Sequence, residues 1–142
     1  MGLFSGTRPD NLGVHDGRLA PSKRTPNNVN SQIDKNADAE HYIEPLRCRG
    51  DAREAWKTLR NIVSGMPRVK IITSDPNYLY AEFSSRLMGY VDDTEFYLDE
   101  KAGVIQVRSA SRLGSSDFGV NRERIESIRA RFAQAQTGSR AQ

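Results

Sequence analysis

The stretch RSASRLGSSDFGVNRER (residues 108–124) decides the fold, because it passes from strand to loop to helix within one short segment. Gly114 and Gly119 permit backbone angles that residues with a Cβ resist. The Ser and Asp residues at 115–117 can hydrogen-bond nearby backbone and fix a turn. Asn121 is a favourable helix cap, and it stands just before an apolar run with helical spacing, Ile125, Ile128 and Phe132. The stretch therefore predicts a strand joined by a Gly/Ser loop to a helix.

The same stretch is a candidate anion site. A helix start offers free N–H groups and a partial positive charge, and nearby arginines would add guanidinium donors, so a phosphate, carboxylate or sulfate would suit it. The candidate ligand-binding residues are Arg108, Ser109, Ser111, Arg112, Ser115, Ser116, Asp117, Asn121 and Arg122. The alternative is an ordinary strand-to-helix connection, with its arginines in solvent or paired to Asp117 and Glu123.

Upstream of this stretch, alternating apolar and polar residues predict strands at 69–73, 78–84 and 93–98, followed by the strand at 104–110. Short turns separate them, which indicates antiparallel neighbours. One helix is predicted between an N-cap at Asp51 and Gly65, with Trp56 in the core, and another over about 122–135. The expected fold class is α+β with two layers: a four-stranded antiparallel meander, an N-terminal-side helix and a C-terminal helix, preceded by an extended arm.

The domain organisation follows from a change in composition. Residues 1–36 form a polar extended arm, 37–136 a single α+β domain, and 137–142 a polar tail. The arm has too few large apolar side chains to fold alone, so it is disordered, or it lies across a partner or across the domain's own surface. Residues 41–46 suggest a short extended piece or edge strand.

Alternation also predicts a second, polar face of the sheet. If Phe83, Phe96 and Val107 face the helices, Glu82, Glu95 and Arg108 share the opposite face with Tyr80 and Tyr97. In a covered or concave face, such carboxylates have shifted pKa values and can act as acid and base. An alternative catalytic set is therefore Glu82, Glu95 and Asp93, with Arg108 or Arg112 orienting the substrate.

Composition and charge exclude several classes of protein. The 142 residues, 27% charged and 37% hydrophobic, suffice for one domain. The single cysteine, Cys48, excludes an internal disulfide, and with only His15 and His41 beside it a zinc site is not expected. No segment is long and apolar enough for a membrane span or a signal peptide. A net charge of +3, with Phe118 and Phe132 the only aromatics in the basic C-terminal region, does not favour nucleic acid as a partner. We expect a cytoplasmic protein, free or associated with a membrane complex, without metal or cofactor.

Three segments carry a resemblance to a known family: Val91–Phe96, Val107–Arg112 and Gly114–Arg122. Together they resemble the uncharacterised family called domain of unknown function fourteen-ninety-nine, and the resemblance extends over roughly residues 19–134. It implies no activity. The family pattern usually has cysteines where this chain has Ser22 and Asn28, so a thiol role at those positions is absent here, which fits a reducing compartment.

Three functions are compatible with these patterns. The main hypothesis is a non-catalytic binding or assembly module that embraces a protein partner with its arm and holds an anionic group with the 108–124 loop. The second is a small enzyme that uses the carboxylates of the polar sheet face. The third is a peripheral membrane-surface protein that uses Leu3-Phe4 and basic residues.

Overall fold

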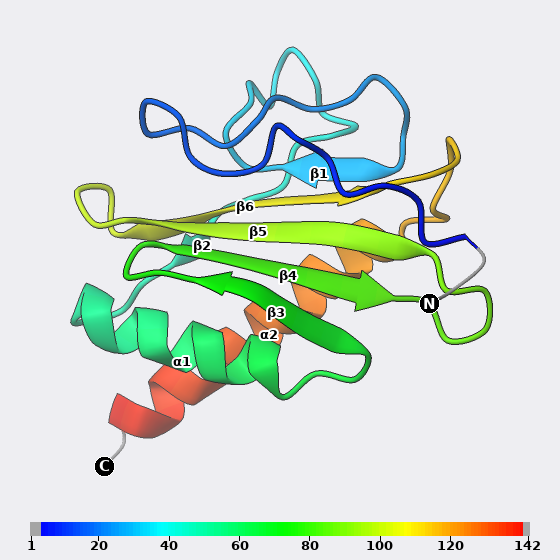
Figure 1. Cartoon of the computed structure of the whole chain (residues 1–142). Coiled ribbons are helices and arrows are strands. Elements are labelled where there is room, and N and C mark those ends of the chain that lie inside the picture. The colour runs from blue at the N-terminus through cyan, green and yellow to red at the C-terminus, as the bar shows by residue number, and fades with distance from the viewer. Residues whose placement is uncertain (1–3, 141–142) are drawn as a thin grey trace.

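The four predicted strands form a continuous antiparallel meander, and two further short strands extend it. The computed structural model describes residues 4–140, with side chains up to residue 137. Its elements are β1 (Asn28–Asn30), β2 (Leu46–Arg47), α1 (Ala52–Ser64), β3 (Val69–Ser74), β4 (Tyr78–Ser84), β5 (Val91–Asp99), β6 (Val104–Ser111) and α2 (Val120–Arg140). The fold is therefore α+β, with the predicted meander at its centre (Figure 1).

The sheet has the order β1-β6-β5-β4-β3, and β2 also pairs with β6. The outer edge of β6 is thus shared by two strands. β1 pairs antiparallel with its C-terminal part, where Asn28 faces Ala110, and β2 pairs with its N-terminal part, where Leu46 faces Ile105. Within the segment 41–46, where an edge strand was predicted, only Leu46 belongs to a strand, and Tyr42 makes a single bridge to Asn30.

Both helices pack on one face of the sheet and close a single apolar core. The Asp51 side chain accepts a hydrogen bond from the Glu54 N–H and caps α1, as predicted. Trp56 lies in the core, also as predicted. The largest buried side chains include Phe96 from β5 and Phe132 from α2. This layer leaves the other face of the sheet for the N-terminal segment.

The N-terminal segment lies across the chain's own sheet, on the face opposite the helices (Figure 1). Leu19 and Ala20 are buried there, and so are Asn27 and Asn28. We call residues 4–27 the arm. The predicted boundary at residue 36 follows no break in the structure, because β1 already belongs to the sheet.

The start of α2 differs from the sequence prediction. Asp117, rather than Asn121, caps this helix: its carboxylate accepts the N–H of Gly119 at 2.8 Å and of Asn121 at 3.1 Å. The helix therefore begins at Val120, and it continues to Arg140, through the first residues of the predicted tail, whose residues 141–142 lie outside the described part. Of the described helices, none combines the length and apolarity needed to cross a bilayer.

Candidate functional site

The arginines of the predicted anion site point to two separate places. Arg108 lies on the polar sheet face, with its Nη1 atom 3.6 Å from Glu95 Oε1. Arg112 binds carboxylates on the same face, including Asp93 at 2.8 Å. Arg122 donates from Nη2 to two backbone carbonyls, those of Glu40 at 2.9 Å and Tyr42 at 2.8 Å. The guanidinium groups therefore do not converge at the start of α2.

The other predicted ligand residues largely bind one another around Asn121, which is fully buried. Asn121 Oδ1 accepts from the Ser109 hydroxyl at 2.6 Å, and its Nδ2 donates to Ser111 Oγ at 2.9 Å, to Asp117 Oδ2 at 2.8 Å and to the Asn27 carbonyl at 3.2 Å. This network joins the arm, β6 and the loop before α2. It occupies the Asn121 side chain and the Ser109 hydroxyl with the protein's own polar groups, while Ser111, Ser116 and Asp117 also line a cavity beside the loop.

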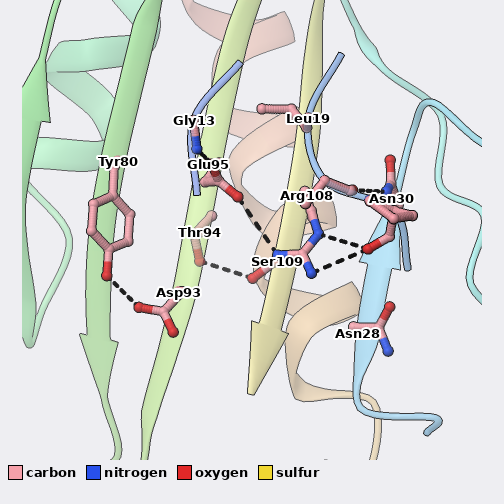
Figure 2. Close-up of polar contacts among 12 residues, drawn as sticks. Gly13, Leu19, Asn28, Asn30, Tyr80, Asp93, Thr94, Glu95, Arg108 and Ser109 are labelled. Atoms are coloured by element: carbon pink, nitrogen blue, oxygen red, sulfur yellow. Dashed lines mark hydrogen bonds and ion pairs between the residues drawn. The ribbon is translucent and has the colours of Figure 1, made fainter. Parts of the chain in front are cut away.

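The polar face of the sheet assembles as alternation predicted. In the register, Tyr80 faces Glu95, and Glu95 faces Arg108. Figure 2 shows Glu95 and Arg108 pointing toward one another from neighbouring strands, with Gly13 of the arm next to Glu95. We call this group the carboxylate cluster; it comprises Glu82, Asp93, Glu95, Tyr78, Tyr80, Arg108 and Arg112. Asp93, Glu95 and Arg108 are each at most 3% exposed, because the arm covers them.

Arg112 connects two carboxylates within this cluster. Its Nε and Nη2 atoms donate to both oxygens of Asp93, at 2.9 and 2.8 Å, and Nη2 also donates to Glu82 Oε2 at 2.5 Å. The Tyr80 hydroxyl, which has one proton to donate, lies within hydrogen-bond distance of both Asp93 and Glu82, and Asp93 is the nearer. Burial alone would raise the pKa of Glu82, but hydrogen bonds from Arg8, Tyr80 and Arg112 outweigh it and lower that pKa. This half of the cluster is a satisfied ionic network.

Glu95 has a different environment. Its Oε2 atom accepts from the Tyr78 hydroxyl at 2.5 Å and from the Gly13 N–H at 2.8 Å, whereas Oε1 accepts no hydrogen bond from the described residues. Burial raises the pKa of Glu95, and the hydrogen bonds from Tyr78 and Gly13 and the charge of Arg108 offset only part of that effect. The proton affinity of this carboxyl group is therefore linked to the docking of the arm.

Replacing Glu95 by glutamine should flatten one component of the pH dependence of stability. A carboxyl group whose pKa is higher in the folded than in the unfolded state binds more protons when folded. Stability is therefore greatest below the unfolded pKa and falls as pH rises through the folded pKa. Glu95→Gln removes this slope, which urea denaturation at a series of pH values would measure. An unchanged slope would show that Glu95 titrates alike in both states.

The carboxylate cluster offers no open site for acid–base catalysis. Asp93 and Glu95 are closed from solvent and occupied by tyrosine, arginine and backbone donors. A substrate could reach them only after the arm had left the sheet. Within residues 4–137, no three His, Cys, Asp or Glu side chains gather so that they could hold a metal ion. The geometry thus favours a structural role for the catalytic set Glu82, Asp93 and Glu95.

The feature that sequence reasoning missed is an apolar surface at the end of the sheet. Its members come from the β4–β5 loop, the β6–α2 loop and the first residue of α2, and they are the large apolar side chains exposed within the described residues. We call this group the apolar loop surface; it comprises Leu87, Met88, Tyr90, Leu113, Phe118 and Val120. The sequence did contain a signal for this surface, because large apolar residues stand in two segments that have the composition of turns. Apolar loop residues mark an interaction site when they are contiguous.

The two loops enclose a cavity of about 380 Å³. Tyr90, Leu113 and Phe118 contribute to its walls, and the ion pair between Arg124 and Asp92, at 2.9 Å, also lines it. Ser115 is exposed in the same loop, and Ser116 lines the cavity. Four of the six exposed side chains, those of Tyr90, Leu113, Phe118 and Val120, therefore line the cavity, and Leu87 and Met88 belong to the loop that contributes Tyr90.

The first described residues of the arm contact both loops. Phe4 stacks on Tyr90, with ring centroids 5.0 Å apart, and its N–H donates to the Met88 carbonyl at 3.4 Å. A Cβ on Gly6 would lie 3.1 Å from Leu113 Cγ, so the arm passes directly against the second loop. Leu3, the other half of the predicted Leu3-Phe4 anchor, lies outside the described residues. Phe4 therefore belongs to the same end of the molecule as the apolar loop surface.

Comparison with known proteins gives one match. Neither the curated proteins nor the solved structures yield a match to this chain. A family model matches residues 18–132, which include every strand, α1 and most of α2. The chain belongs to the family described as Protein of unknown function (DUF1499).

Proposed function

We propose that the chain is a non-catalytic binding module that attaches to its partner through the apolar loop surface. The observation that carries this proposal is the exposure of six large apolar side chains from two adjacent loops. Exposed apolar residues scattered singly are ordinary, whereas a contiguous patch marks an interaction site. The buried carboxylates and their arginines, by contrast, are bound to one another.

The conformation of Phe118 supports this role. Its φ angle is +53°, in the left-handed region, and its side chain is 92% exposed. A left-handed conformation costs a residue with a Cβ about 1–2 kcal/mol, and an exposed aromatic ring gains nothing from folding to offset that cost. A backbone held at such a cost at a loop tip favours a role in binding.

The proposal assigns different parts of the chain from those expected from sequence. The sequence assigned the contact with the partner to the arm. Because the arm lies on the chain's own sheet, we assign that contact to the two loops instead, and Phe4 is the part of the arm that joins them. The anionic group expected at the 108–124 loop is not part of the proposal, because Arg108, Arg112 and Arg122 are engaged elsewhere. We place the module in the cytoplasm, associated with a membrane or a membrane complex; a single half-buried thiol, Cys48, fits a reducing compartment.

Site-specific photocrosslinking in the native host tests the proposal. A photoreactive amino acid at position 118 should yield a discrete adduct, whereas the same group at position 57, exposed on α1, should not. Leu87→Ser with Leu113→Ser should abolish the adduct at 118. Equal labelling at 118 and 57 would refute a binding role for these loops, as would the absence of both a protein and a lipid adduct at position 118.

A further inference from the structure

We propose that the apolar loop surface inserts into the interface of an anionic lipid membrane. This inference rests on the proposed function, because it names the partner of the same surface. It draws on three features of the described residues: the shape of the exposed apolar group, the charges beside it, and the polar groups next to Phe118.

The most exposed apolar side chains stand at the tips of separate loops. Leu87 in the β4–β5 loop is 89% exposed, and Phe118 in the β6–α2 loop is 92% exposed. Both loops and the start of the described chain lie at the same end of the sheet, the right-hand end in Figure 1. Projecting tips of this kind can enter the boundary between headgroups and acyl chains side by side, to a depth of about 5–10 Å.

The charges at this end of the molecule favour an anionic surface. Arg86 precedes Leu87 in the same turn, and Arg68 lines the cavity between the loops. Both are exposed, and the ion pairs found among the described residues involve other arginines. The acidic groups nearby are occupied: Asp92 by Arg124, and Asp117 by the N–H groups at the start of α2. An arginine stem can lie along apolar surface while its guanidinium group reaches the headgroups.

The polar groups beside the Phe118 tip also suit lipid headgroups. Ser115 and Ser116 are exposed in the loop that ends at Phe118, where hydroxyls and free arginines can hydrogen-bond phosphate oxygens. Unpaired arginines beside hydroxyls and projecting apolar tips therefore match the mixture of phosphate and acyl groups at an anionic membrane surface.

Vesicle co-sedimentation of the full chain tests the inference. The probes are vesicles of phosphatidylcholine alone and vesicles of phosphatidylcholine and phosphatidylglycerol in equal parts. We expect binding to the mixed vesicles that is weakened by salt, and much weaker binding to phosphatidylcholine. Leu87→Ser with Phe118→Ser should reduce binding to mixed vesicles by at least about tenfold. Arg86→Gln and Arg68→Gln should each reduce it by about fivefold.

Two control variants separate insertion from general effects of charge or folding. Leu87→Met with Phe118→Leu keeps the tips apolar and should retain binding. Arg131→Gln removes an exposed charge from α2, away from the loops, and should bind as the wild type does. The altered side chains are exposed, so thermal unfolding should show equal stability for the serine and apolar variants.

Several results would overturn the inference. Absence of binding to the mixed vesicles would do so, as would equal binding by the serine variant and the wild type. A protein adduct at position 118, without vesicle binding, would leave the proposed function standing and remove the lipid partner. Absence of both the adduct and vesicle binding would remove the two together.

Discussion

Replacing Arg112 by methionine should lower the free energy of unfolding by about 3–5 kcal/mol. Arg112 is the cation shared by Asp93 and Glu82, and all three side chains are at most 12% exposed. Methionine keeps most of the side-chain volume but leaves two buried carboxylates without their main donor. Urea denaturation at neutral pH measures the loss.

A matched control lies on the surface of the same protein. Arg53 pairs with Glu100, and both side chains are about half exposed, so Arg53→Met should cost at most about 1 kcal/mol. A loss at Arg112 no larger than the loss at Arg53 would show that Asp93 and Glu82 find other partners or water. In that event the carboxylate cluster would not be the closed network that the distances indicate.

The second large effect is expected at Arg108, and it should depend on pH. Arg108→Met removes the cation that pairs with Glu95, and we expect a loss of about 3–5 kcal/mol at neutral pH. The arm is also affected, because the Pro21 carbonyl loses its donors, Arg108 Nε and Nη2, at 3.3 Å. Without the cation, the pKa of Glu95 rises further above its usual range, so the variant loses more stability as pH increases. At mildly acidic pH Glu95 takes up a proton, and the loss should shrink.

A double variant tests this explanation. Arg108→Met with Glu95→Gln contains neither charge, so its stability should exceed that of Arg108→Met at neutral pH and should lack the added pH dependence. Denaturation of both variants at mildly acidic and mildly alkaline pH gives the comparison. A loss at Arg108 that is the same at every pH would mean that the packing of the arm, rather than the charge of Glu95, sets its size.

The sequence predicted the features that depend on strand periodicity. Alternation along β4, β5 and β6 assigned Phe83 and Phe96 to the core, and it brought Glu95 and Arg108 together on the opposite face. Such predictions succeed because a period of two residues determines the face of every side chain in a strand. They do not reveal what covers that face, because the covering segment is distant in sequence.

The features that the sequence did not reveal depend on such distant partners. β1 has the sequence Asn-Val-Asn, which resembles a loop, and it is a strand only because β6 supplies its partner. Asn121 and Asp117 are both suited to capping a helix, and local sequence does not distinguish them. Ser109 and Asn27 draw the Asn121 side chain inward, which leaves the capping role to Asp117. Arg108 and Arg112 were likewise assigned to a ligand because their carboxylate partners lie on neighbouring strands. Arg122 was assigned so because the backbone carbonyls that it binds are distant in sequence.

The pairing of β1 with β6 has a consequence for how the nascent chain folds. Asn28 leaves the ribosome long before Ala110, its partner in the sheet. The N-terminal segment therefore cannot pair with β6 until most of the polypeptide has been synthesised. The hairpins β3–β4 and β4–β5 need only local contacts and can form first. We therefore expect the segment to dock last, and a chain arrested before β6 to leave the polar side of its hairpins in water.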